Sequence, residues 1–449
     1  MPFSPVAAAL SSVCPDGWQV LPLGEVAYFQ EGPGILAKDF RGSGVPLLRL
    51  KGVEGDYVTL DGCNYLDREM VARKWNHFRV EAGDLLISTS ASLGRVSEVT
   101  KESAGGIPYT GLIRFKPKDP RLLAGYLKVF LGSAAFVEQA ESMASGSVIR
   151  HFGPSHIRQM AILLPPLDQQ ARIGQLASFF DERLRLLRQT NATLEAIAQA
   201  LFKSWFVDFD PVRAKAEGRE PEGMDAATAA LFPAEFEDSA LGPIPKGWRT
   251  GSFDHLASLA KGAINPLQAP AITYEHYSLP AFDAGQLPVL ELGEAIKSNK
   301  TSVPNGAVLQ SKLNPHIPRI WFLGDVGEHA VCSTEFLPWT AREGSSPELV
   351  YCTLRSPAFR AQVLTLVTGT SNSHQRVKPD QVAKLCLVIA PSVIREAFAS
   401  LARPILAKVV SQRRSAKTLA DLRDVLLPRL ISGKLRLPEA QAQLEDALS

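Results

Sequence analysis

The chain has 449 residues, which is long enough for two or three domains that each bury a core of their own. A hydrophobic content of 45% and a charged content of 21% are ordinary for a globular protein, and no apolar run approaches the roughly 18 residues of a membrane span. The formal net charge of +2 excludes a broad basic surface, so any contact with nucleic acid should be confined to local patches.

Cysteine usage and the N-terminus indicate the compartment. The five cysteines are scattered, odd in number and free of CxxC pairs, which argues against a zinc site and against a disulfide framework. The short apolar stretch Pro2–Leu10 has no basic residue before it and lacks the pattern of a signal peptide. We therefore expect reduced thiols, no metal and a cytoplasmic location.

Residues 1–165 predict a first globular domain of mixed helix and strand. Trp18–Tyr28 suggests a strand followed by a helix, and Leu122–Met143 carries the one-sided apolar stripe of a helix. Between them, four short runs have the composition of strands and are separated by Gly, Asp and Pro: Val45–Leu50, Tyr57–Leu60, Asp84–Ser88 and Gly111–Phe115.

Residues 166–206 predict one long helix that packs lengthwise on another helix. Five apolar residues stand seven positions apart, which is the spacing of a coiled coil: Ile173, Phe180, Leu187, Leu194 and Leu201. Leu176 and Ile197 fill two of the intervening positions. Leu184 and Trp205 stand one position further on, where they would widen the apolar stripe.

The second half of the chain repeats the organisation of the first half. A shift of 225 residues places Pro154–Phe206 on Pro379–Ile431 without a gap, although only 8 of the 53 pairs are identical. Each copy has a loop, a short apolar strand, a proline and a long helix, and each opens with Pro-x-Gly-Trp. The duplication predicts an α+β protein with pseudo-two-fold symmetry, in which each long helix packs against the other.

The remaining parts follow from this repeat. Residues 246–390 form a second globular domain, with strands expected at Ala307–Gln310, Arg319–Phe322 and Ala330–Ser333 and a helix at residues 347–368. Residues 207–245, with nine acidic and three basic residues, form an acidic connector, and residues 437–449 form a frayed tail.

Residues 391–436 form the second long helix. Pro404 should kink or restart this helix, because proline cannot donate the helical hydrogen bond. Its expected contacts with the first helix are Phe398, Leu401, Ile405, Leu419, Leu422 and Leu426.

Two motifs carry a resemblance to a known family. Leu164-Pro165-Pro166-Leu167, with Gln170 and Ile173, and the run Leu194–Arg213 resemble the first conserved region of the specificity subunits of type I restriction–modification enzymes. Leu427–Leu435 resembles the end of the family's second conserved region. The second copy departs from the pattern, because Ala390–Arg395 stands where a Pro-Pro-Leu-x-x-Gln signature would recur.

The resemblance implies a non-catalytic subunit with two target-recognition domains, each of which reads one half of a split, asymmetric DNA sequence. It also implies that the two long helices pack as an antiparallel coiled coil, which holds those domains apart. The family's partners are two methyltransferase subunits, which use S-adenosylmethionine to methylate adenine. Two restriction subunits, which use ATP and Mg, can join them to cut unmodified DNA. The chain itself would bind no cofactor.

Polar and basic loops provide the candidate DNA contacts. Ser, Lys and backbone N–H groups bind phosphates, and Arg, Asn, Gln and His pair with base edges. Such loops recur at matching places in both halves, which favours DNA contact over the alternative of a plain solvated surface. The candidates are Lys38, Arg41, Lys51, Ser90, Arg95, Ser147, Arg150, His151, Lys312, Asn314, His316, Arg319, Asn372, His374, Gln375 and Arg376.

The sequence carries no recognisable catalytic signature. There is no GxxxxGK[ST] loop, and Asp210-Pro211-Val212 lacks the second proline and the aromatic residue of the adenine methyltransferase motif. Two alternatives stay open: a helical scaffold that binds no DNA, and the specificity subunit of a methylation-only complex. Binding of duplex DNA at low and moderate salt would separate the scaffold from the DNA reader.

Overall fold

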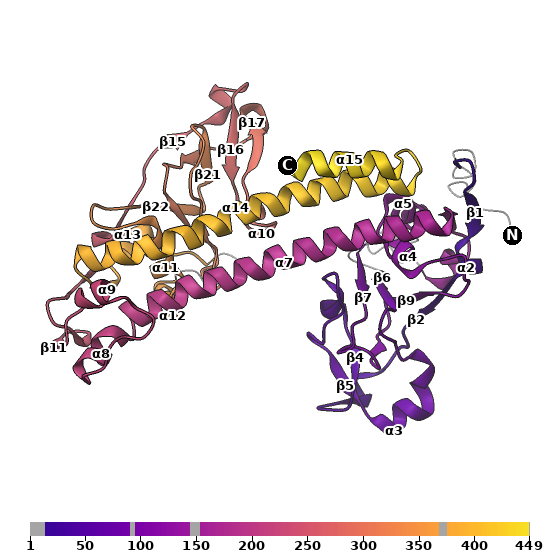
Figure 1. The fold of residues 1–449 in the computed structure, drawn as a ribbon, viewed down its shortest axis with the longest axis horizontal. Coiled ribbons are helices and arrows are strands. Elements are labelled where there is room, and N and C mark those ends of the chain that lie inside the picture. Colours follow the sequence, from indigo (N-terminus) through magenta and orange to yellow (C-terminus); the bar gives the residue numbers. More distant parts are fainter. Residues whose placement is uncertain (1–13, 90–94, 144–152, 368–374, 449) are drawn as a thin grey trace. The chain divides into compact units, whose positions relative to one another are not determined.

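The seven-residue pattern produces two uninterrupted helices of 40 residues each, α7 (Leu167–Phe206) and α14 (Ser392–Ile431). They belong to a computed structural model that describes residues 14–89, 95–143, 153–367 and 375–448. The chain divides into two compact units, one of residues 1–185 with 418–449 and one of residues 186–417. Each unit therefore contains a globular domain, part of α7 and part of α14 (Figure 1).

The first globular domain is built on two four-stranded sheets. One sheet is fully antiparallel, in the order β2 (Ala27–Glu31), β9 (Leu112–Pro117), β6 (Leu85–Ser88) and β7 (Val96–Glu98). The other has the order β3 (Phe40–Arg41), β5 (Asn64–Leu66), β4 (Val45–Leu48) and β8 (Ile107–Pro108), with β4 and β8 parallel. The expected strand Tyr57–Leu60 is wrong, because only Tyr57 makes a single bridge, to Glu98.

Helices and a two-stranded pairing connect this domain to α7. The expected helix Leu122–Met143 is two helices, α4 (Ala124–Leu131) and α5 (Ala134–Met143), separated at Gly132-Ser133. After α6 (Pro154–Ile157), strand β10 (Ala161–Leu164) leads into α7 and pairs antiparallel with β1 (Gln19–Pro22), which precedes the short helix α2 (Leu23–Val26).

The second globular domain repeats the antiparallel sheet in the same order. Its strands are β14 (Ala257–Leu259), β22 (Phe336–Ala341), β19 (Val308–Ser311) and β20 (Ile320–Phe322). The pairing of β1 with β10 is likewise repeated by β13 (Arg249–Ser252) with β23 (Cys386–Ile389). The expected class, an α+β protein with two globular domains that each precede a long helix, is confirmed.

The other sheet differs between the two domains. In the second domain it has five strands, in the order β15 (Ala263–Ile264), β18 (Lys300–Ser302), β21 (Ala330–Ser333), β16 (Thr273–Tyr277) and β17 (Val289–Leu292). The first domain instead continues from β5 into a helical segment, with α3 (Arg68–Met70), a π-helical turn Val71–Trp75 and a 3-10 turn Asn76–Phe78.

Three further helices complete the second domain before β23: α11 (Pro347–Arg355), α12 (Pro357–Thr365) and α13 (Pro379–Ala383). The expected single helix at residues 347–368 is interrupted at Ser356, whose side chain accepts a hydrogen bond from the Phe359 N–H and so begins α12.

The acidic connector has secondary structure of its own and packs on the core of the second unit. It contains α8 (Asp210–Ala216), α9 (Ala226–Ala230) and a hairpin of β11 (Phe236–Ser239) with β12 (Gly242–Pro245). Phe209 adopts a left-handed conformation with φ of 55°, and its ring packs edge-on against Trp248 with centroids 5.6 Å apart.

The two long helices run antiparallel within each unit. In the second unit, the Phe398 ring of α14 lies against three rings near the end of α7: Phe202, Trp205 and Phe206. Further along, Glu195 of α7 pairs with Arg413 of α14, so rising residue numbers on one helix meet falling numbers on the other. In the first unit Asp181 lies beside Arg423, which continues the same direction.

Most of the expected contact residues face inwards. Ile173, Phe180, Leu187, Phe398, Leu419 and Leu426 are buried, and Leu176, Leu194, Leu201, Ile405 and Leu422 are half-buried. Ile197 and Leu401 were expected in the interface but are 48% and 47% exposed, so this expectation is wrong. The inward positions are one residue later, at Ala198 and Ala402, where small side chains let the packed elements come close together.

The expected restart of the second helix at Pro404 and the expected frayed tail are both wrong. The helix α14 continues through Pro404 without a restart. Pro404 and Ser400 both lie on its exposed side, where water can bind the carbonyl that loses its donor. The tail is not frayed, because Leu437–Leu448 forms helix α15, in which Ala440 is buried. Within the described part of the chain, no helix has the length and apolarity required to cross a membrane.

We expect Phe398→Ala to lower the free energy of unfolding by about 3–5 kcal/mol, because it removes a fully buried ring and leaves a cavity among other aromatic side chains. Leu401→Ala, three residues later on the exposed side of α14, should change the free energy by no more than about 0.5 kcal/mol. Urea unfolding followed by tryptophan fluorescence measures both variants. Equal losses would show that the assigned helix faces are wrong.

Candidate nucleic-acid interface

In the second domain, the loop after β19 lies beside a segment 60 residues further along the chain. Leu313 and Arg376 form an antiparallel bridge, the Asn314 N–H donates to the Gln375 carbonyl at 2.8 Å, and the Val377 N–H donates to the Lys312 carbonyl at 3.1 Å. The structure therefore brings together four of the candidate residues, Lys312, Asn314, Gln375 and Arg376. We call these four residues the loop cluster.

Asn314 has the most unusual conformation in the loop cluster. Its φ of 49° is in the left-handed region, which asparagine tolerates better than most residues. Its side-chain oxygen is buried and has no hydrogen-bond partner among the described residues. Such backbone conformations and unsatisfied polar groups are often found at functional sites.

The two arginines of this region are held by carboxylates. Arg376 is exposed, and its Nε and Nη2 lie 3.1 and 3.0 Å from the two carboxylate oxygens of Glu335. These hydrogen bonds raise the pKa of the Arg376 guanidinium above its ordinary value. Because an exposed ion pair contributes little to stability, the guanidinium is oriented but can exchange Glu335 for another anion.

Arg319 has a different environment, at the base of the loop. It donates to both oxygens of Asp283 in α10 (Leu279–Asp283) at 2.7 and 2.8 Å, and only 14% of its side chain is exposed. This arrangement anchors the loop to α10. His316 lies on the exposed part of the same loop.

In the first domain, three candidates lie on the exposed surface near the second sheet. Lys38 and Lys51 are in 3-10 turns, and Arg41 donates to the carbonyls of Lys38 and Phe40 at 3.0 and 2.8 Å. The structure therefore leaves both lysine side chains exposed, while Arg41 is held close to its own turn.

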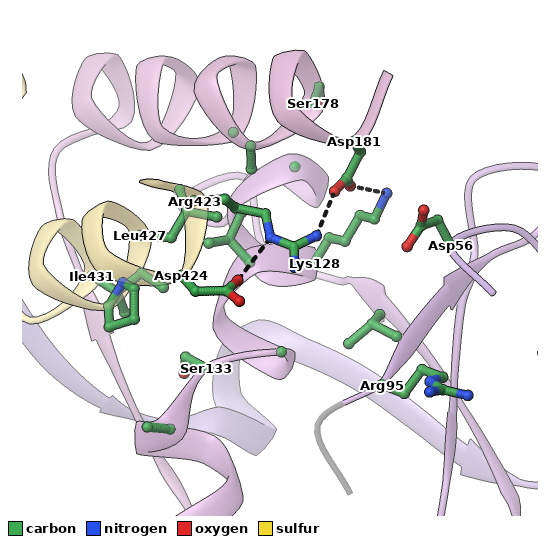
Figure 2. Close-up of a pocket in the computed structure, with 18 residues that line it drawn as sticks. Asp56, Arg95, Lys128, Ser133, Ser178, Asp181, Arg423, Asp424, Leu427 and Ile431 are labelled. Carbon is green, nitrogen blue, oxygen red and sulfur yellow. Dashed lines mark hydrogen bonds and ion pairs between the residues drawn. The ribbon is translucent and has the colours of Figure 1, made fainter. Parts of the chain in front are cut away.

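Arg95 has a different location from the one expected. It lines a cavity of about 560 Å³ between the first domain, α7 and the end of α14 (Figure 2). Other charged residues at this cavity are Asp56, Lys128, Asp181, Arg423 and Asp424. Arg95 is therefore not grouped with Lys38, Arg41 and Lys51.

The remaining six candidates, Ser90, Ser147, Arg150, His151, Asn372 and His374, lie outside the described residues. The described residues contain no group of three or more His, Cys, Asp or Glu side chains that could hold a metal ion.

One exposed basic segment was missed in the sequence. The helical segment 68–78 of the first domain exposes Arg68, Arg73, Lys74 and His77. Its start is fixed by Asp67, whose carboxylate accepts a hydrogen bond from the Met70 N–H at 2.8 Å. The available signal was Asp67, a residue type that favours a helix start, followed by Arg68, Arg73 and Lys74, but the segment is too short to show helical periodicity.

Comparison with known proteins supports the resemblance. Residues 15–196 match the family described as the type I restriction modification DNA specificity domain. The chain is 22% identical over 443 residues to the type I restriction enzyme MjaIX specificity subunit of Methanocaldococcus jannaschii, with 95% of each chain covered. It is 23% identical over 406 residues to the HindI specificity subunit of Haemophilus influenzae, with 79% of this chain and 87% of the relative covered.

A solved structure has the same fold. The type-I restriction-modification system S subunit from M. genitalium superimposes with a TM-score of 0.56 at 12% sequence identity, covering 92% of this chain and 96% of that chain. Residues 15–196 thus match the type I restriction modification DNA specificity domain, and along most of its length the chain is similar to specificity subunits of type I restriction enzymes, as its motifs predict.

Proposed function

We propose that the chain is the non-catalytic, DNA-reading subunit of a type I restriction–modification complex. Each globular domain reads one half of a split, asymmetric DNA site, and the paired helices α7 and α14 carry both domains. We call them the first and second recognition domains.

The observation that carries this proposal is a repeated frame with different surfaces. The strand order β2-β9-β6-β7 of the first domain recurs as β14-β22-β19-β20 in the second domain. The other sheet of each domain differs, and so does the segment that follows β5 in the first domain and β17 in the second. A shared frame places both domains on the helices in a similar way. Different surfaces allow the two half-sites to have different sequences.

The loop cluster has the chemistry that DNA contact requires. Lys312 and the backbone can bind phosphates, and Asn314, Gln375 and Arg376 have the side chains that pair with adenine and guanine edges in the major groove. The chain-wide charge of only +2 fits contacts confined to such loops.

The partners follow from the family. Two methyltransferase subunits would bring S-adenosylmethionine and methylate adenine, and two restriction subunits would use ATP and Mg to cut unmodified DNA. The chain itself would hold no cofactor. The relatives are named specificity subunits of type I restriction enzymes, which supports this division of labour. The alternative of a scaffold without DNA affinity is tested by the following binding experiment.

We expect Arg376→Ala to weaken DNA binding without unfolding the protein. If the guanidinium contacts a base, the cognate site loses about 1–3 kcal/mol of binding free energy and other sequences lose little. If it contacts a phosphate, all sequences weaken and the slope of log K against log salt falls by about one. Filter binding of duplex DNA by the complex with its modification subunits, at several salt concentrations, measures both quantities.

Arg219→Ala is the matched control for this experiment. Arg219 is also an exposed arginine in an ion pair, and it pairs with Glu217 in the connector rather than within the loop cluster. If both variants have the same DNA affinity and the same salt slope, Arg376 makes no contact with DNA. If the complex that contains the unaltered chain does not bind DNA, the alternative of a helical scaffold is favoured.

A second experiment tests whether the two domains read independent half-sites. Residues 15–165 are exchanged for those of a relative, so that β1 and β10 are transferred as a pair. We expect one half of the methylated motif to change and the other half to stay, because the second domain keeps its own sheets and loops. Methylome sequencing of a host that expresses the chimera with its modification subunit gives the result.

The reciprocal exchange, of residues 246–390, should change the other half of the motif. A chimera that assembles and methylates DNA but changes both halves at once would contradict independent reading. If the chimera methylates the original motif unchanged, the first domain does not read DNA sequence.

A further inference from the structure

The helix α7 carries two mostly buried carboxylates, Asp181 and Glu195, 14 residues apart. Fourteen residues are two seven-residue repeats, so both occupy the same position of the pattern. Asp181 belongs to the first unit and Glu195 to the second. Each one binds a cation from the globular domain and an arginine from α14, which makes α7 the shared element of two similar ion triads.

In the second unit, Glu195 lies between Arg355 of α11 and Arg413 of α14. Its two carboxylate oxygens are 2.7 Å from Arg355 Nη1 and 2.5 Å from Arg413 Nη2. The side chains of Glu195 and Arg413 are only 14% and 9% exposed. Arg355 also donates to the Tyr351 hydroxyl at 2.7 Å, which fixes the guanidinium on the surface of α11.

In the first unit, Asp181 lies between Lys128 of α4 and Arg423 of α14 (Figure 2). Lys128 Nζ is 3.1 Å from Asp181 and 3.4 Å from Glu98 of β7, and Arg423 Nη1 is 3.9 Å from Asp181. Burial lowers the pKa of the Lys128 ammonium, but Asp181 and Glu98 together raise it above its ordinary value, so the lysine stays charged.

The first triad stands next to a close helix crossing. A Cβ added at Gly174 of α7 would lie 3.2 Å from the Gly125 carbonyl carbon of α4, so the two backbones nearly touch there. A single crossing point leaves the angle between two helices adjustable. The Lys128–Asp181 bridge is a second attachment, roughly 10 Å further along α7, and the two together define the angle.

Ion pairs hold a geometry more tightly than apolar contacts do. Apolar side chains can slide or repack at small cost, whereas a buried charge that loses its partner is strongly unfavourable. The cavity of about 560 Å³ lies beside Asp181 and Lys128, so close packing does not surround this bridge on every side. Its charges therefore add to the backbone crossing and to the hydrogen bonds of Gln170 in holding the domain against α7.

We propose that Asp181 and Glu195 are positioning residues, which set the orientation of each recognition domain on the helix pair and thereby the gap between the two half-sites of the DNA. The inference rests on the proposed function, because a gap exists only if both domains read DNA. Loss of either bridge lets one domain rotate, so that its half-site is also accepted one base pair nearer or further away.

The test measures gap preference with the full chain in complex with its modification subunit. Methylome sequencing of the unaltered complex first gives the two half-sites and their native gap. A plasmid library then carries the same half-sites at gaps from two base pairs shorter to two longer. Asp181→Asn and Glu195→Gln keep the side-chain shape and remove the charge. We expect methylation at gaps altered by one base pair to rise about tenfold relative to the native gap.

A purely structural effect has a different signature, because fewer folded complexes would lower methylation by the same factor at every gap. Glu182→Gln is the matched control. Glu182 is the neighbour of Asp181, and it pairs with Arg185 one turn away on the same helix. We expect this variant to keep the native gap preference.

A second pair of variants avoids leaving Arg413 without its carboxylate partner. Arg413 Nη1 has no hydrogen-bond partner among the described residues, so Glu195→Gln leaves a nearly buried cation and can prevent assembly. Lys128→Gln and Arg355→Gln instead remove only the recognition-domain side and keep the bridges between the helices. We expect the same broadened gap preference from them.

The results separate the two levels of the proposal. An unaltered complex that methylates no split site overturns the proposed function and this inference with it. An unaltered complex with one native gap, together with assembled variants that keep this gap unchanged, overturns the positioning role alone. Methylation that falls equally at all gaps in Lys128→Gln and Arg355→Gln also overturns it.

Discussion

The apolar seam between α7 and α14 is the interaction on which the rest of the structure depends. Each of the two compact units contains a part of both helices, so neither unit is complete without the seam. In the second unit the seam is an aromatic cluster around Phe398, and the connector and the second domain pack on the same core. The small side chains of Ala198 and Ala402 lie fully buried in this core, which lets the surrounding elements approach closely.

On this shared support, the duplicated domains have kept their frame and changed their surfaces. The antiparallel sheet and the short pairing of strands before each long helix are equivalent in both copies. The second sheet and the segment that follows its β5 or β17 strand differ between the two domains. Packing constrains a buried sheet much more than an exposed loop, so divergence is concentrated where a DNA reader would need it.

Charged groups have two separate roles in this chain. At the exposed loops, Arg376 is paired with Glu335 in a bridge that contributes little to stability and can be exchanged for a phosphate or a base. At the junctions between helices and domains, Asp181 and Glu195 are mostly buried and bind two cations each. These pairs are more specific in geometry, because the two carboxylates are mostly buried and lose favourable interactions when their cations move away.

The duplication, the two long helices and the likeness to type I specificity subunits could be predicted from the sequence, because each depends on a local period or a contiguous motif. The tertiary structure decided the rest. The seven-residue count favoured Ile197 and Leu401, whereas the inward positions are Ala198 and Ala402, since backbone approach selects small residues that carry no strong apolar signal. The loop cluster joins residues 60 positions apart, and Glu195 meets Arg355 across 160 positions. No local pattern records such contacts, because they form only when the sheets and both helices are in place.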